Sequence, residues 1–160
     1  MIDALIGKPF VFGRQDCYTI IREFYKLAFD LDLTDFARTE EWMDRDLWSE
    51  MYKIDGFQII NHDRHQLQLG DILAIAINTS YPTHGAVYLG NNKVLHQRPN
   101  SVGCVDDYKG ILYNGTLAAF RHPQADLSRI VSVEHRDFFA EYPTRLRMRA
   151  EALRRRVAEG

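Results

Sequence analysis

With 160 residues, the chain is long enough for one domain that buries its own core, so it needs no disulfide or metal to hold it together. A formal net charge of -2 excludes the strongly basic surface typical of nucleic-acid-binding proteins. No apolar run reaches the roughly 20 residues of a membrane-spanning helix, and no secretory signal pattern opens the chain. We therefore expect a protein made in the cytoplasm, with both cysteines reduced.

The first predicted element is an amphipathic helix that begins at Cys17. Its apolar residues recur at steps of three and four: Cys17, Ile20, Ile21, Phe24, Tyr25 and Ala28. This is the period of a helix with one buried face. Asp16 directly precedes the helix and can cap its first turn. Cys17 is therefore expected at a helix N-terminus, on the apolar face.

Beyond this helix the sequence pattern changes from helical to extended. Residues 34–52 are polar and aromatic and predict a second helix or two short ones. After the Gly70-Asp71 turn, short apolar runs bounded by turn residues predict strands. The predicted strands cover residues 72–77, 84–90, 93–97 and 117–121. Helices followed by strands with short turns predict an α+β fold with an antiparallel sheet.

Three residues in this arrangement have the chemistry of an acyl-transfer site. Cys17 opens a helix, where the dipole and the free N–H groups favour a thiolate. His84 opens one predicted strand and His96 lies on the next. One histidine can take the thiol proton while a third polar group orients its ring. The backbone N–H of Cys17 is placed to stabilise an oxyanion.

These three residues also have other interpretations. Cys17 could be a small apolar residue of the core, and each histidine could be a partly buried strand residue. Cys17, His84 and His96 could instead be three ligands of a zinc ion. The residue types alone leave these alternatives open.

The remaining residues of these types are interpreted as structural. His62 and His65 have loose metal-ligand spacing, but the polar sequence around them favours an exposed loop. Cys104 is most simply structural, and Asp71 is a turn residue.

The predicted hairpin places the two histidines on opposite faces of the sheet. A two-residue turn at Asn91-Asn92 is favoured because asparagine tolerates positive φ. With that turn Val87 lies opposite His96, and opposed residues share a face. His84 then lies on the other face, which conflicts with a cooperating pair. One bulge or a longer turn would remove the conflict.

Four motifs in order resemble the NlpC-like family of papain-type cysteine peptidases, which cut cell-wall peptides. The family pattern has an aromatic-glycine loop before Asp-Cys, a Gly-Asp turn, a His-led strand ending in Tyr-x-Gly, and a second histidine. In this chain the motifs read FVFGRQDCYTIIREFY, LGDILAIAI, HGAVYLG and VLHQ, within about residues 7–122. The resemblance implies a papain-like fold in which N-terminal helices pack on a small antiparallel sheet, a half-barrel.

The same resemblance implies roles for the three residues. Cys17 would be the nucleophile, His84 the general base, and His96 the residue that orients the base. Both histidines would share one side of the sheet, so we expect a bulge or a longer turn in the hairpin. The resemblance implies no metal and no cofactor.

One departure from the family pattern bears on the oxyanion hole. Many relatives supply a tyrosine hydroxyl from the loop before the cysteine, where this chain has Phe10. Tyr18 and Gln15 are the remaining side-chain candidates for oxyanion donors, with Asp16 in support. Loss of one donor costs about 100- to 1000-fold in turnover, so we expect activity that is weak or depends on a partner.

The chain resembles in particular the tail-tip subgroup of this family from long-tailed bacteriophages. Tyr18 after the cysteine, the REFY end of the helix, the acidic tryptophan-containing region and the segment Phe120 to His122 carry this likeness. It implies an endopeptidase at the virion tail tip that is made in the host cytoplasm and opens peptidoglycan stem peptides during genome entry. The alternatives are a structural tail protein that keeps the fold, or another papain-like amidase or acyltransferase.

The C-terminal segment is predicted to be separate from the peptidase domain. We expect the domain over residues 1–130 and a charged helix over residues 131–160. The apolar residues of that helix are spaced four, three and four: Leu146, Ala150, Leu153 and Val157. An apolar seam on a charged helix favours a protein partner, so we expect it to dock on other tail-tip proteins.

Overall fold

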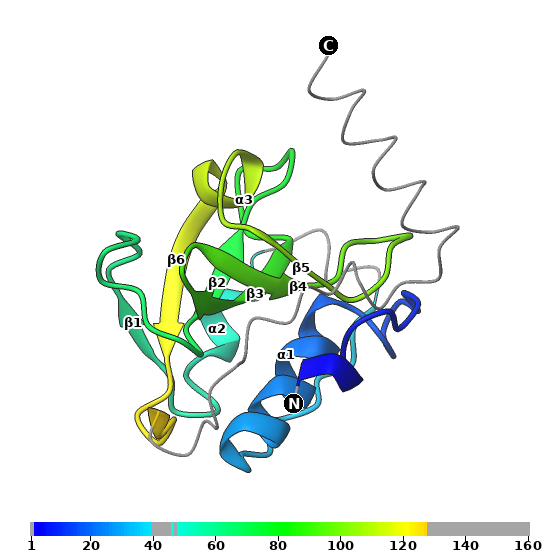
Figure 1. The fold of residues 1–160 in the computed structure, drawn as a ribbon, viewed down its shortest axis with the longest axis horizontal. Helices are drawn as coiled ribbons and strands as arrows, with labels where there is room; N and C mark the ends of the chain where they lie inside the picture. The colour runs from blue at the N-terminus through cyan, green and yellow to red at the C-terminus, as the bar shows by residue number, and fades with distance from the viewer. Residues whose placement is uncertain (1, 40–45, 47, 128–160) are drawn as a thin grey trace.

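The computed structural model describes residues 2–39, 46 and 48–127. Its centre is a six-stranded antiparallel sheet in the order β1-β6-β2-β3-β4-β5, and α1 packs against β3 and β4 (Figure 1). The predicted α+β fold is confirmed. The helix predicted over residues 131–160 and the boundary predicted at residue 130 lie outside the described residues.

The described elements run in the following order along the chain. They are η1 Ile2–Ala4, α1 Cys17–Phe29, α2 Trp48–Met51, β1 Gln58–Ile60, β2 Ile72–Ile75, β3 His84–Gly90, β4 Lys93–His96, β5 Cys104–Asp107, α3 Ile111–Asn114 and β6 Thr116–Arg121. None of the helices in this described part of the chain is long and apolar enough to cross a membrane.

The first helix begins where the sequence predicts. Asp16 is the N-cap, and its side chain accepts hydrogen bonds from the backbone N–H groups of Tyr18 and Thr19. The helix ends at Phe29 because Asp30 adopts the left-handed conformation, with φ of 55°, and returns its N–H to the helix. The buried face of α1 therefore runs toward the sheet and keeps Cys17 at the end nearest β3.

The second helix, or two short ones, predicted over residues 34–52 is present in part, and residues 40–45 and 47 of that range lie outside the described residues. Residues 30–39 have no regular secondary structure, and within the described part of the predicted range only α2 Trp48–Met51 is helical. The cause lies in side chains that occupy the backbone groups of this segment. The Tyr18 hydroxyl donates to the Thr34 carbonyl at 2.7 Å, and the Arg38 guanidinium donates to the Phe36 carbonyl at 2.7 Å. Backbone groups bound in this way are not available for helical hydrogen bonds.

The four predicted strands are present, and the sheet also has two that were not predicted. β2 stops at Ile75, two residues before the predicted end. β1 has only three residues, two of them exposed, and β5 reads CVDD, so neither shows the alternation that marks a strand. Backbone pairing of β1 with β6 and of β5 with β4 holds both strands in the sheet, although their sequences do not predict them.

A β-bulge in the hairpin of β3 and β4 resolves the conflict between the two histidines. Gly90 pairs with Lys93 around the two-residue turn, but Tyr88 pairs with Val94, so the register shifts at Leu89. Beyond the shift Ala86 lies opposite His96. Ala86 and His84 share a face because side chains alternate along a strand. The expected bulge is confirmed.

Two apolar cores lie on the two faces of the sheet. Along β2, Ile72 and Ala74 belong to the core that contains α1, whereas Leu73 and Ile75 belong to the second core. Because both faces of β2 are covered, its sequence is apolar at every position. The site described below lies at the end of this sheet, where α1 begins and β3 starts.

Candidate active site

Cys17 lies against the start of β3, the strand that carries the predicted base. It is the first residue of α1, and 9% of the residue is exposed. Its thiol forms hydrogen bonds with the backbone of Gly85, which directly follows His84, and of Tyr18. Burial, followed by the Asp16 carboxylate, raises the pKa of the Cys17 thiol to about 12. The thiol is therefore protonated and needs a base to become a nucleophile.

Gly85 allows this close approach because it has no side chain. A Cβ at Gly85 would lie 2.3 Å from the Trp48 ring and 2.9 Å from the Ile21 side chain. Both contacts are shorter than carbon atoms tolerate. Any larger residue would therefore push α1 and Trp48 away from the strand that Cys17 touches.

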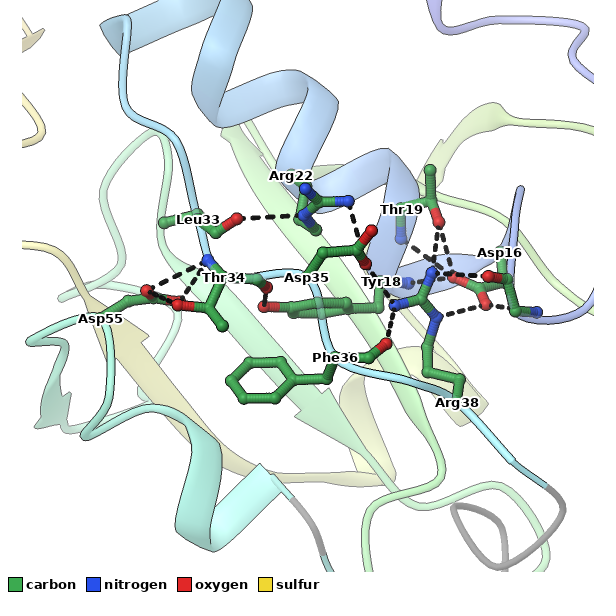
Figure 2. A network of polar contacts seen from close by, with 11 residues as sticks. Asp16, Tyr18, Thr19, Arg22, Leu33, Thr34, Asp35, Phe36, Arg38 and Asp55 are labelled. Atoms are coloured by element: carbon green, nitrogen blue, oxygen red, sulfur yellow. Dashed lines mark hydrogen bonds and ion pairs between the residues drawn. The ribbon is translucent and has the colours of Figure 1, made fainter.

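Asp16 holds the N-terminus of α1 in a buried network (Figure 2). Its carboxylate accepts three backbone hydrogen bonds, from the N–H groups of Gly13, Tyr18 and Thr19. It also pairs with Arg38 Nε at 2.6 Å, and both side chains are almost fully buried. The Cys17 N–H is not among the groups that Asp16 binds. Asp16 thus supports the helix end without using the Cys17 N–H.

His84 and His96 form a buried hydrogen-bonded pair. Nε2 of His84 lies 2.9 Å from Nδ1 of His96, and 3% of His84 and none of His96 is exposed. Burial, followed by the neighbouring side chains of His96 and Arg98, lowers the pKa of His84 to about 3. At neutral pH His84 is therefore uncharged, which is the form that accepts a proton.

Asp106 on β5 extends this pair into a chain of three side chains. Its Oδ2 lies 3.0 Å from Nε2 of His96 and 3.5 Å from a guanidinium nitrogen of Arg98. The hydrogen bond from His96 is the main cause that lowers the pKa of Asp106. The carboxylate, whose side chain is 41% exposed, is thus ionised at neutral pH.

The charge of Asp106 determines which nitrogen of His84 carries the proton. An ionised carboxylate only accepts hydrogen bonds, so Nε2 of His96 must donate. Nδ1 of a neutral His96 then accepts, and Nε2 of His84 must donate to it. Nδ1 of His84 is left without a hydrogen, as the acceptor. Asp106 therefore keeps His84 in the tautomer that can take a thiol proton on Nδ1.

The two side-chain candidates for the oxyanion hole have different surroundings. The Tyr18 hydroxyl donates to the Thr34 carbonyl at 2.7 Å, so its proton is already used. Gln15 makes two long contacts from its amide nitrogen, 3.3 Å to Gln97 and 3.4 Å to Glu23. Gln15 is therefore the less constrained of the two donors, and Tyr18 is held by the extended segment.

The other residues considered in the sequence have distinct places. His62 and His65 are exposed in a loop, as expected. Asp71 is buried and binds Arg121 through both oxygens, at 2.8 and 2.7 Å. Cys104 is half-buried on β5, directly opposite His96. Within the described residues, the group whose ligand atoms converge is His96, Cys104 and Asp106, which differs from the alternative zinc set of Cys17, His84 and His96.

The model described as the NlpC/P60 family matches residues 7–121, most of the chain. The chain belongs to the NlpC/P60 family. This confirms the resemblance drawn from the four motifs, which cover nearly the same residues.

One curated relative of this NlpC/P60 chain is a phage protein. The chain is 28% identical over 121 residues to the tail tip assembly protein K of Escherichia phage lambda, a match that covers 76% of this chain and 60% of the relative. The chain thus spans about 60% of that relative's length.

Two solved structures share the fold of this NlpC/P60 chain. One is described as similar to a lipoprotein of the NLP/P60 family, from Staphylococcus aureus, with a TM-score of 0.51, 22% identity, and coverage of 74% of this chain and 37% of that one. The other is the NlpC/p60 domain of the peptidoglycan hydrolase SagA. It has a TM-score of 0.51 and 19% identity, and the match covers 75% of this chain and 92% of that one.

The residue of this NlpC/P60 site that sequence reasoning missed is Asp106. Cys104 pairs directly with His96 across β4 and β5, and Asp106 lies two residues further on the same face. Diagonal neighbours of this kind are within reach of long side chains. A strand predicted over residues 104–107, in this register, would have brought Asp106 to the histidine pair.

Proposed function

We propose that this chain is a cysteine peptidase that hydrolyses the stem peptides of peptidoglycan at a bacteriophage tail tip. The observation that carries the proposal is the chain of hydrogen bonds from His84 through His96 to Asp106, next to the strand residue that Cys17 touches. Membership of the NlpC/P60 family supports the peptide substrate, and the similarity to a tail tip assembly protein supports the location.

The proposed reaction starts from a neutral thiol and a neutral imidazole. Nδ1 of His84 takes the Cys17 proton as the sulfur attacks the peptide carbonyl carbon, so the two events are coupled. The oxyanion accepts hydrogen bonds from the Cys17 N–H and from the Gln15 amide. His84 then gives its proton to the leaving amine, and the C–N bond breaks to leave a thioester on Cys17.

The second half of the reaction returns the enzyme to its starting state. His84 takes a proton from water, whose oxygen attacks the thioester carbonyl. The C–S bond breaks, the proton returns to the Cys17 sulfur, and the acid is released. Throughout both halves Nδ1 of His96 accepts the hydrogen bond from Nε2 of His84, and Asp106 accepts the one from Nε2 of His96. The two residues thereby stabilise the positive charge on protonated His84.

The direct test is digestion of purified peptidoglycan, with released peptides identified by mass spectrometry. We expect products from the wild-type chain and none from Cys17→Ala or His84→Gln. Cys104→Ser serves as the matched control, because it removes the other thiol and should keep the products. Products that persist in Cys17→Ala would refute cysteine catalysis by this site.

A second candidate function is a structural tail protein that retains the fold. The buried, protonated thiol of Cys17 and the absence of a hydroxyl at Phe10 favour this alternative. Alkylation with a small iodoacetamide distinguishes the two. A nucleophile should be labelled in the folded protein at a rate that drops at least about 100-fold in His84→Gln, the size expected for loss of a general base. Labelling only after unfolding would favour the structural protein.

The partners follow from the same proposal. The substrate is a peptidoglycan peptide, and the other partners are tail-tip proteins that dock on the predicted C-terminal helix of residues 131–160. The proposed reaction uses only the side chains of the chain itself and no cofactor. Truncation after residue 130 should therefore keep peptide cleavage and abolish co-purification with the other tail-tip proteins.

A further inference from the structure

A second group of reactive side chains lies on the far side of His96 from His84. Nε2 of His96, the thiol of Cys104 and the carboxylate of Asp106 lie within 4.8 Å of one another. The thiol is 3.9 Å and Nε2 is 3.0 Å from the same oxygen, Oδ2 of Asp106. His96 is buried, whereas the other two residues are half-buried at the edge strand β5. The group is thus open to an ion from solvent on one side.

The register of the sheet, rather than a flexible loop, sets this geometry. Cys104 is the direct cross-strand partner of His96, and Asp106 is the next residue on that face of β5. A thiolate, an imidazole and a carboxylate are ligand types that Zn²⁺ takes in proteins, at about 2.0 to 2.3 Å each. Ligand atoms on one zinc ion lie closer together than 4.8 Å, so the half-buried thiol must move inward by about an ångström.

We propose that His96, Cys104 and Asp106 bind one Zn²⁺ ion, with water as a fourth ligand, and that the bound ion switches the peptidase off. The site itself stands on the geometry of the three side chains. The inhibition rests on the proposed function, because it concerns the same His84 that serves there as the base. Three protein ligands and an open position are enough for zinc.

Inhibition follows from the proton positions in the histidine pair. A metal ion on Nε2 of His96 takes the lone pair of that nitrogen, so a neutral His96 must carry its hydrogen on Nδ1. Nδ1 then donates to Nε2 of His84 across the 2.9 Å contact, and His84 must carry its own hydrogen on Nδ1. That nitrogen can no longer take the Cys17 proton. Each ring stays neutral. The bound zinc ion thus moves the hydrogen of each ring from Nε2, where Asp106 keeps it, to Nδ1.

Three existing contacts of Asp106, from His96, Arg98 and the Cys104 thiol, must give way to the ion. The hydrogen bond from His96 is lost because Nε2 becomes a ligand, and the Arg98 guanidinium, 3.5 Å away, must withdraw. The Arg98 side chain is 51% exposed and can move into solvent. The thiol of Cys104 releases its proton to solvent when it binds the metal.

Metal binding is tested first, with the full chain under reducing conditions and Co²⁺ as the probe. We expect one ion per chain and the near-ultraviolet absorption of a cobalt-thiolate bond in wild-type and Cys17→Ala, with Zn²⁺ displacing Co²⁺. In Cys104→Ser we expect no thiolate absorption and a Zn²⁺ affinity that is about 10- to 100-fold lower. Absorption that is lost in Cys17→Ala and kept in Cys104→Ser would overturn the site, as would no thiolate absorption in any variant.

The switch is then read independently of peptide cleavage, from the ring nitrogens of ¹⁵N-histidine protein by NMR. We expect Zn²⁺ to convert Nδ1 of His84 from a nitrogen without hydrogen to one that carries it, in wild-type and not in Cys104→Ser. An unchanged His84 tautomer in zinc-loaded protein would overturn the switch. If peptidoglycan is cleaved, Zn²⁺ should inhibit wild-type at a concentration at least about 10-fold below that needed for Cys104→Ser. Absence of cleavage would count against the proposed function and leave both spectroscopic readouts intact.

Discussion

Two aspartates flank the candidate site, and they act in opposite ways. Asp16, on the helix side, is almost fully buried, pairs with a buried Arg38 and takes three backbone hydrogen bonds. Asp106, on the sheet side, is 41% exposed and meets His96 and the exposed Arg98. The first carboxylate raises the pKa of the Cys17 thiol, whereas the second binds His96, the partner of the proposed base His84. In the proposed reaction, the same residue type therefore supports folding on one side and proton transfer on the other.

This difference follows from what each charge would leave behind. Removal of Asp16 strands a buried guanidinium and several backbone donors, which is costly in a low-dielectric interior. Removal of Asp106 leaves a ring nitrogen and an exposed guanidinium that water can reach. We therefore expect removal of Asp16 to lower the free energy of unfolding and removal of Asp106 to lower the activity. The four predictions below test that division.

The largest effect is expected from Asp16→Ala. The substitution removes the buried carboxylate partner of the buried Arg38 and leaves only the exposed Asp35, so we expect a loss of about 3–5 kcal/mol in the free energy of unfolding. Urea denaturation of the purified chain measures it. Asp35→Ala is the matched control, since Asp35 also pairs with Arg38 but its side chain is 61% exposed, and it should cost at most about 1 kcal/mol. Equal losses in the two variants would show that the Asp16 pair is not a structural element.

Asp106→Ala should have the reverse profile. Without the carboxylate, His96 is free to adopt either tautomer, and only one of them keeps His84 able to accept the thiol proton. We expect kcat to fall by about 10- to 100-fold, the effect typical of losing a group that orients a histidine, with little change in the urea midpoint. Asp106→Glu should recover part of the loss.

The neighbouring Asp107 provides the control for that experiment. It carries an exposed carboxylate that pairs with Lys93 and Lys109, and it differs from Asp106 in facing away from His96. Asp107→Ala should keep both activity and stability. An Asp106→Ala variant with normal kcat would remove Asp106 from the proton-transfer chain.

Acid should destabilise the sheet side through His84. Its pKa of about 3 in the fold lies below the ordinary value of 6.5, so between those values the unfolded chain binds a proton that the folded chain does not. Stability is therefore full above about pH 6.5 and falls as the pH drops toward 3, by up to about 1.4 kcal/mol per pH unit. Urea midpoints between pH 7 and about 5.5 measure the slope before most carboxylates titrate.

The matched pair for the pH experiment is His84→Gln and His62→Gln. His84→Gln should flatten the acid slope, because the titrating group is gone. His62→Gln should keep it, since His62 is exposed in a loop. The same slope in both variants would mean that His84 does not carry the acid sensitivity.

The helix side of the site was predictable because its determinants are local. The period of the apolar residues and the adjacent Asp16 fix the start of α1 at Cys17 without reference to any distant segment. Arg38 was not predicted, because it reaches Asp16 from an extended segment that the sequence pattern indicates as helical. Tertiary hydrogen bonds to Thr34 and Phe36 outweigh helix propensity there.

The sheet side was predictable in residue type and not in register. The histidines were found, and their parity conflict required a bulge, which the structure has at Leu89. Asp106 was missed because β5 is short and its sequence, CVDD, has no strand alternation. Its role appears only once Cys104 is paired with His96. Register between strands depends on long-range packing, which a sequence pattern of four residues does not determine.

Gly90→Ala tests whether the bulge determines the histidine register, and it has the smallest expected effect. Gly90 has a φ of +83°, and a Cβ there would meet nothing within 4 Å, so the only cost is backbone strain of about 1 kcal/mol. Gly56→Ala is matched, with a φ of +77° and equally open surroundings, and it should lose the same stability in urea. Only Gly90→Ala should also weaken peptide cleavage, because strain at the bulge displaces His84 from His96. If the two variants cleave equally, the packing of the histidines, rather than the bulge, fixes their register.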